Sequence, residues 1–158
     1  MAAHLLGVLA LVAVALLLGA TWYETVVMAP NYERDIPASL ALARQFLVRT
    51  TPAHFFRVIA PCAQFLTLLA AVLDWRKPGD GAFLVALAVL IVADVITYVF
   101  HYPRLAIMFK SGDAQDAGAL RRAAREWAVG NVIRGVLLIV AFLALLGGTV
   151  HLATHLHA

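Results

Sequence analysis

Four long apolar stretches alternate with short polar segments along the chain. They cover approximately residues 5–28, 55–73, 82–104 and 126–152. A helix needs roughly 20 mainly apolar residues to cross a hydrocarbon core of about 30 Å, whereas the strands of a membrane barrel are much shorter. We therefore expect an all-α integral membrane protein, in which residues 1–158 form a single four-span domain, a four-helix bundle with antiparallel neighbours.

The polar segments predict how these spans are connected. Between the second and third spans, residues 77–81 read Lys-Pro-Gly-Asp-Gly, a turn signal that makes those two helices antiparallel neighbours. In the longer first loop, Asp35-Ile36-Pro37 followed by residues 39–47 predicts a short helix at the membrane interface. After a break at residues 111–113, residues 114–125 predict a helix that runs directly into the fourth span.

The composition agrees with a membrane solvent. Of the 158 residues 63% are hydrophobic and 13% are charged, and the mean hydropathy is +0.89, more apolar than a soluble domain can bury. The formal charge of +3 is better explained by topology and anionic lipid headgroups than by nucleic acid, which we do not expect as a partner. The single cysteine, Cys62, excludes a disulfide within the chain.

Basic residues are distributed unevenly between the two sides. The side that holds only Arg76 and Lys77 also holds both chain ends, and the first stretch lacks the basic start of a cleaved signal peptide. By the positive-inside rule the other side faces the cytoplasm, so both termini should lie outside it, in what we expect to be a bacterial inner membrane. The cytoplasmic loops carry Arg34, Arg44, Arg49, Arg104, Lys110, Arg121, Arg122 and Arg125.

Polar side chains interrupt the spans, all toward the side of the basic loops. Such residues are costly in a bilayer and usually face the bundle interior or a wet cavity. On three spans they recur at spacings of three, four or seven residues, so each set lies on one helix face and the sets should form a polar pocket. They are Glu24 on the first span; His54, Arg57 and Gln64 on the second; Asp94, Tyr98 and His101 on the third; and Trp127, Asn131 and Arg134 on the fourth.

Helix geometry predicts one ion pair within this pocket. At about 1.5 Å per residue, Asp94 lies about 10 Å deeper than His101, and Arg134 lies about 12 Å deeper than Glu126. Asp94 and Arg134 should therefore meet and form a structural ion pair that fixes the register of the bundle. A second role for Arg134, in which it also binds an anionic or enolic oxygen, stays open.

The histidines allow several kinds of chemistry. Glu24, His54 and His101 could converge on a metal, but the Glu-x-x-His signature of such bundle sites is absent, and we expect no metal. His54 or His101 could serve as a general base, or both could be structural. His151 and His155 have metal-ligand spacing, although a frayed helix end explains them better.

The chain resembles the anthrone oxygenase-like family of small four-span membrane proteins. The resemblance covers nearly the whole chain, and the segment from Trp127 to Arg134 is its most distinctive part. The matching residues are Gly19-Ala20, Tyr23-Glu24 and Pro30; Phe55-Phe56 and Pro61; Asp94, Thr97, Tyr98 and Pro103; and Arg125, Trp127, Asn131 and Arg134.

The resemblance implies a cofactor-independent oxidoreductase of the monooxygenase kind, which converts anthrones or other lipophilic phenols that enter from the membrane. One of His54 or His101 would remove a proton from the substrate, and Arg134 and Asn131, with Tyr98 nearby, would stabilise the resulting oxyanion. The pocket would be lined by Glu24, Arg57, Gln64 and Trp127.

An enzyme at this pocket could also be a proton-abstracting isomerase of a lipophilic substrate, and two non-enzymatic alternatives stay open. The chain could be a non-catalytic protein that binds a quinone or haem, or an accessory subunit of a membrane complex. It could also be a purely structural bundle, in which the polar residues serve packing alone. A homo-oligomer is compatible with every one of these functions.

Overall fold

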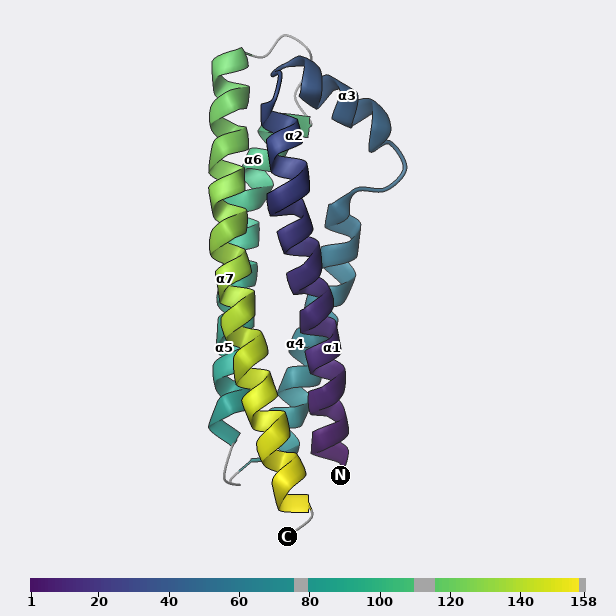
Figure 1. Ribbon diagram of the computed structural model, residues 1–158, viewed down its shortest axis with the longest axis vertical. Helices are drawn as coiled ribbons and strands as arrows, with labels where there is room; N and C mark the ends of the chain where they lie inside the picture. The colour runs from purple at the N-terminus through teal and green to yellow at the C-terminus, as the bar shows by residue number, and fades with distance from the viewer. Residues whose placement is uncertain (76–79, 110–115, 157–158) are drawn as a thin grey trace.

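The computed structural model describes residues 1–75, 80–109 and 116–156, and the expected all-α architecture is confirmed. Within these ranges every regular element is helical. Four helical segments are long and apolar enough to cross a membrane: Ala2–Glu33, Pro52–Leu73, Gly81–Phe109 and Ala117–Thr154. They form an antiparallel bundle whose two chain ends lie at the same end, the lower one in Figure 1.

The first span is a helix in three parts. It consists of α1 (Ala2–Tyr23), a π-helical turn η1 (Glu24–Met28) and α2 (Ala29–Glu33). The predicted interfacial helix follows as α3 (Ala38–Phe46), which lies across the end of the bundle opposite the termini (Figure 1). Leu40 of α3 is fully buried in a cluster with Tyr32, Met108 and Trp127, so α3 braces that end.

The second, third and fourth spans are also helical. The second span is α4 (Pro52–Leu73), which begins with a proline in its first turn. The third consists of α5 (Asp80–Ile96), the π-helical turn η2 (Thr97–His101) and α6 (Tyr102–Phe109). The fourth is α7 (Ala117–Leu156), which confirms that the helix after the third loop runs into the span.

The helices extend beyond the apolar stretches at the end that carries α3. The sequence boundaries followed hydropathy, but arginine, glutamate and alanine have high helix propensity, so the helix continues where hydropathy falls. Accordingly α7 begins at Ala117, within the helix predicted over residues 114–125, and continues through the apolar stretch that starts near residue 126. The predicted turns at 77–81 and 111–113 lie wholly or largely outside the described residues.

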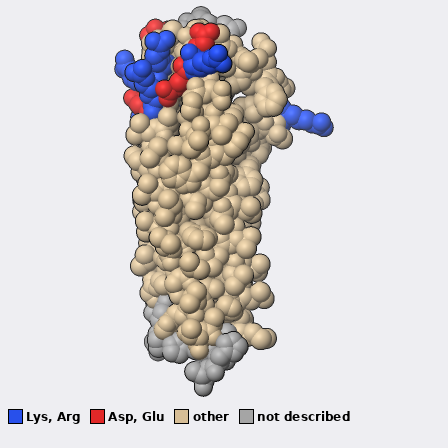
Figure 2. Space-filling view, viewed as in Figure 1, with Lys and Arg blue, Asp and Glu red and all other residues tan. Residues whose placement is uncertain are grey.

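Small side chains bring the spans close together. The central core is rich in alanine, with Ala10, Ala63, Ala86 and Ala141 fully buried between helices. Close backbone approach of this kind replaces the hydrophobic effect as the main cohesive force between helices in lipid. Large apolar side chains instead point outward along the spans, and in Figure 2 the charged side chains gather at the end that carries α3.

The arrangement gives a direct test of orientation. We expect the charged end to face the cytoplasm, because basic residues are retained on that side during insertion. In a bacterial host, alkaline phosphatase fused after residue 158 should be active, and green fluorescent protein fused there should be dark. The reverse pattern would contradict the expected orientation.

Candidate functional site

Two π-helical turns lie at the level where polar residues enter the bundle. The turn η1 begins with the buried Glu24, and η2 ends with the buried His101. A π turn adds one residue to a helical turn and therefore rotates the residues that follow it; such turns are frequent at functional sites. On the first span the buried positions pass from Thr21 and Glu24 to Ala29 and Tyr32, so the side that faces the core is kept.

Glu24 and Arg134 form the central ion pair of the site. Nη2 of Arg134 donates a hydrogen bond to Oε2 of Glu24 at 3.0 Å, and the two residues are only 8% and 6% exposed. The guanidinium carbon also lies 4.4 Å from the ring centre of Phe56, a cation-π contact. Three spans therefore meet at this pair, through η1, α4 and α7.

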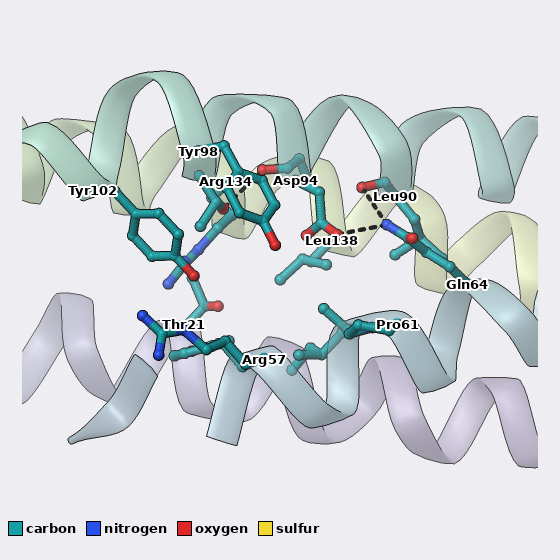
Figure 3. Close-up of a pocket in the computed structure, with 15 residues that line it drawn as sticks. Thr21, Arg57, Pro61, Gln64, Leu90, Asp94, Tyr98, Tyr102, Arg134 and Leu138 are labelled. Carbon is teal, nitrogen blue, oxygen red and sulfur yellow. Dashed lines mark hydrogen bonds between the residues drawn. The ribbon is translucent and has the colours of Figure 1, made fainter. Parts of the chain in front are cut away.

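The predicted pairing of Arg134 with Asp94 is replaced by this arrangement. Asp94 instead accepts a hydrogen bond from Nε2 of Gln64 at 2.7 Å (Figure 3). Asp94 and Arg134 do lie at a similar depth, because they line the same small cavity. The predicted partner was wrong, because residue spacing along two helices cannot show that Glu24 of a third span pairs with Arg134.

His101, the last residue of η2, is buried with its side chain against α7. It is 1% exposed; the backbone of Gly130 interacts with the ring, but no ring nitrogen forms a hydrogen bond of good geometry with a described residue. The ring can sit there because Gly130 has no side chain: a Cβ at that position would lie 3.1 Å from Cε1 of His101 and 2.8 Å from the ring of Phe100. Buried polar atoms without partners usually bind water or a ligand.

Asn131 and Thr21 also carry buried polar atoms without hydrogen-bond partners among the described residues. Asn131 is fully buried, and its amide oxygen and nitrogen have no hydrogen-bond partner among the described residues. The hydroxyl of Thr21 and Nε of Arg134 likewise have no hydrogen-bond partner among the described residues. Several donors and acceptors are therefore available around the Glu24–Arg134 pair.

A cavity of about 400 Å³ lies at the α3 end of the bundle, and we call it the vestibule. This volume is within the range of about 300–1,000 Å³ that is typical of small-molecule sites. Its wall includes four aromatic rings, and the guanidinium of Arg57 lies 5.7 Å from the ring centre of Tyr102. The rings belong to Tyr32, Tyr102, Phe109 and Trp127.

Two smaller cavities continue from the vestibule into the bundle. One, of about 30 Å³, is lined by His101 and Arg134 and shares Glu24, Tyr102 and Trp127 with the vestibule. The other, of about 40 Å³, is the one drawn in Figure 3. Its lining includes Arg57, Gln64, Asp94, Tyr98 and Arg134.

The predicted residues are therefore brought together with one clear exception. His54 is exposed, and its Nδ1 accepts a hydrogen bond from the backbone of Thr51 at 3.1 Å as part of a capping box at the start of α4. This local role accounts for His54 without any catalytic function. Asn131 is buried next to the site but is not part of the lining of the cavities described above.

Sequence reasoning missed several residues of the site. Tyr32 and Tyr102 were not among the expected site residues, yet both form part of the wall of the vestibule. Thr21 carries no ionisable group and gave no signal. Within the described ranges, no group of three or more His, Cys, Asp or Glu side chains is placed to hold a metal.

The fold and the site define a small four-span membrane protein with a polar site inside the charged half of its bundle. The family model for anthrone oxygenase matches residues 46–144, which is more than half of the chain. The chain therefore belongs to the anthrone oxygenase family. Searches among curated proteins and among solved structures found no match.

The matched region contains most of the site. His101, Asn131 and Arg134 lie inside it, whereas Glu24 and Tyr32, which come from the first span, lie outside. The family membership and the four spans confirm the resemblance that the sequence suggested.

The stability of the bundle should reveal the true partner of Arg134. We expect Arg134→Ala to lower the free energy of unfolding by about 3–5 kcal/mol, because it leaves Glu24 as an unpaired buried charge. Adding Glu24→Gln should recover part of that loss in a double-mutant cycle, measured by unfolding in detergent. Adding Asp94→Asn should not, and recovery by Asp94→Asn alone would contradict the observed pairing.

The contact between Gly130 and His101 can be tested in the same way. Gly130→Ala should destabilise the bundle by about 1–3 kcal/mol, because its methyl group would overlap Phe100 and press on His101. Gly147→Ala is the matched control on the same helix, since a Cβ there meets no atom within 4 Å. Equal thermal stability of the two variants would contradict the close approach.

Proposed function

We propose that this protein is a cofactor-independent oxygenase of anthrone-like, lipophilic phenolic substrates. The observation that carries the proposal is the buried imidazole of His101, to which no described side chain is hydrogen-bonded. It lines a small cavity together with Arg134, and this cavity adjoins an aromatic-walled vestibule. Membership of the anthrone oxygenase family supports the same reaction.

The vestibule suits a flat, fused-ring substrate. Rings of Tyr32, Tyr102 and Trp127 offer faces and edges for stacking, which favours aromatic ligands over flexible ones. The wall also carries the arginines Arg44 and Arg57, and the buried pair of Glu24 and Arg134 lies at the inner end. A phenol or ketone oxygen would therefore point inward, and the hydrocarbon rings would fill the vestibule.

The proposed chemistry begins with removal of a proton by His101. The imidazole takes a proton from the acidic methylene carbon of the anthrone, and the electron pair moves onto the ketone oxygen as an enolate. Arg134 stabilises this oxyanion, since its Nε has no partner among the described residues and its charge is fixed by Glu24. Asn131 and Tyr98 are second candidates for this role.

Oxygen is then reduced by the substrate itself. The enolate transfers electrons to O₂, a carbon–oxygen bond forms, and the peroxide receives the proton from the imidazolium. Loss of the second methylene proton breaks the oxygen–oxygen bond and releases water, which leaves the quinone carbonyl. One anthrone and one O₂ thus give one anthraquinone and one water.

Substitution of His101 and of His54 should have different effects on the rate of oxygen uptake. We expect His101→Asn to lower the rate of oxygen uptake with anthrone by roughly 10²–10⁴-fold, the usual contribution of a general base. His54→Asn should retain the rate of the wild type, because His54 caps α4 and stays outside the cavities. The measurement is oxygen consumption in proteoliposomes, corrected for the spontaneous oxidation of anthrone.

Three outcomes would contradict this assignment. Full activity of His101→Asn would exclude it as the base, and loss of activity in His54→Asn with normal folding would return the role to the other histidine. A wild-type protein that binds anthrone but leaves oxygen uptake at the spontaneous rate would favour a non-catalytic ligand-binding protein instead.

A further inference from the structure

A second hollow lies on the outer face of the bundle, between α1 and α4. It has a volume of about 310 Å³, and we call it the recess. Apart from one carboxylate its lining is apolar or aromatic, and none of the vestibule's basic side chains takes part. Around that carboxylate, which belongs to Glu24, the lining consists of Gly19, Ala20 and Tyr23 from α1 and Pro52, Phe55 and Phe56 from α4.

The recess exists because a side chain is missing. Gly19 is exposed, and a Cβ built on it would meet no atom within 4 Å. A side chain at position 19 would therefore extend into this open space.

The recess leads to the same polar pair as the vestibule. Glu24 and Phe56 line both the recess and the small cavity that contains His101. Phe56 packs edge-on against Phe55 with ring centres 5.5 Å apart, and its face carries the guanidinium of Arg134. Glu24 and Phe56 therefore lie between the recess and the interior of the site.

The position of the recess favours a lipophilic phenol as its occupant. It lies where the apolar span meets the charged end, which is the depth that amphipathic aromatic rings prefer in a bilayer. Its rings can stack on a flat hydrocarbon, and the carboxylate of Glu24 can accept a hydrogen bond from a phenolic hydroxyl. A lipid acyl chain would satisfy the apolar lining alone.

We propose that the recess is the lateral portal by which a flat, lipophilic phenol passes from the membrane to the Glu24–Arg134 pair. The ring of Phe56, which can swing only by leaving Arg134, is the barrier between portal and site. The proposal rests on the proposed function for the identity of the substrate, and it adds the route by which that substrate arrives.

The first test fills the portal. Gly19→Leu in proteoliposomes should lower kcat/KM for membrane-dissolved anthrone at least tenfold, mainly through a higher KM, and leave kcat near the wild-type value. Gly147→Leu is the matched control, because this glycine is also exposed and unobstructed but lies near the opposite end of the bundle. An unchanged KM in Gly19→Leu would overturn the proposal.

The second test does not depend on turnover. In a Cys62→Ser background, the thiol of Gly19→Cys should react with a lipid-soluble maleimide, and anthrone should slow that reaction severalfold. The thiol of Gly147→Cys should react at the same rate with and without anthrone. If anthrone slowed the labelling of neither thiol, the portal would be overturned. If anthrone slowed the labelling of Gly19→Cys but the protein consumed no oxygen, the portal would be retained and only the proposed oxygenase activity would be contradicted.

Discussion

The buried ion pair between Glu24 and Arg134 holds the spans together at the level of the site. Two charges inside a membrane bundle are tolerated only when they neutralise each other, because each alone would have to leave water without compensation. Their contact fixes η1 against α7 at one depth, and Phe56 adds α4 through its cation-π contact. All three inner cavities and the recess touch one member of the pair. A buried charge pair that served packing alone would not need such open surroundings.

The π turns explain how the polar residues reach this pair without disturbing the apolar core. Between the π turns and the chain ends, α1 and α5 each pack against α4 and α7 through small residues at helical spacing. Beyond the turns, toward α3, the added residue of each π turn changes which positions are buried, and Tyr32 and Met108 join the cluster that holds α3. The site therefore lies at the junction of two differently packed halves, one built for lipid and one for the charged interface.

Much of this fold could be predicted from the sequence, and the reasons are physical. Hydropathy and length identify spans, and helical spacing predicted that Arg134, His101, Asp94 and Gln64 face inward. The partner of Arg134 could not be predicted, because pairing across three helices depends on rotation, which the π turns change. The role of His54 was equally hidden, since a cap at the start of a helix and a residue of a polar stripe have the same spacing.

We propose that an aromatic oxygen compound binds against the Glu24–Arg134 pair, beside His101. The most direct measurement is an experimental structure of the protein in lipid nanodiscs with anthraquinone, the expected product. We expect the rings to lie in the vestibule against Trp127, with a quinone oxygen within hydrogen-bond distance of Arg134. Density for the ligand elsewhere, with the vestibule free of it, would contradict the claim.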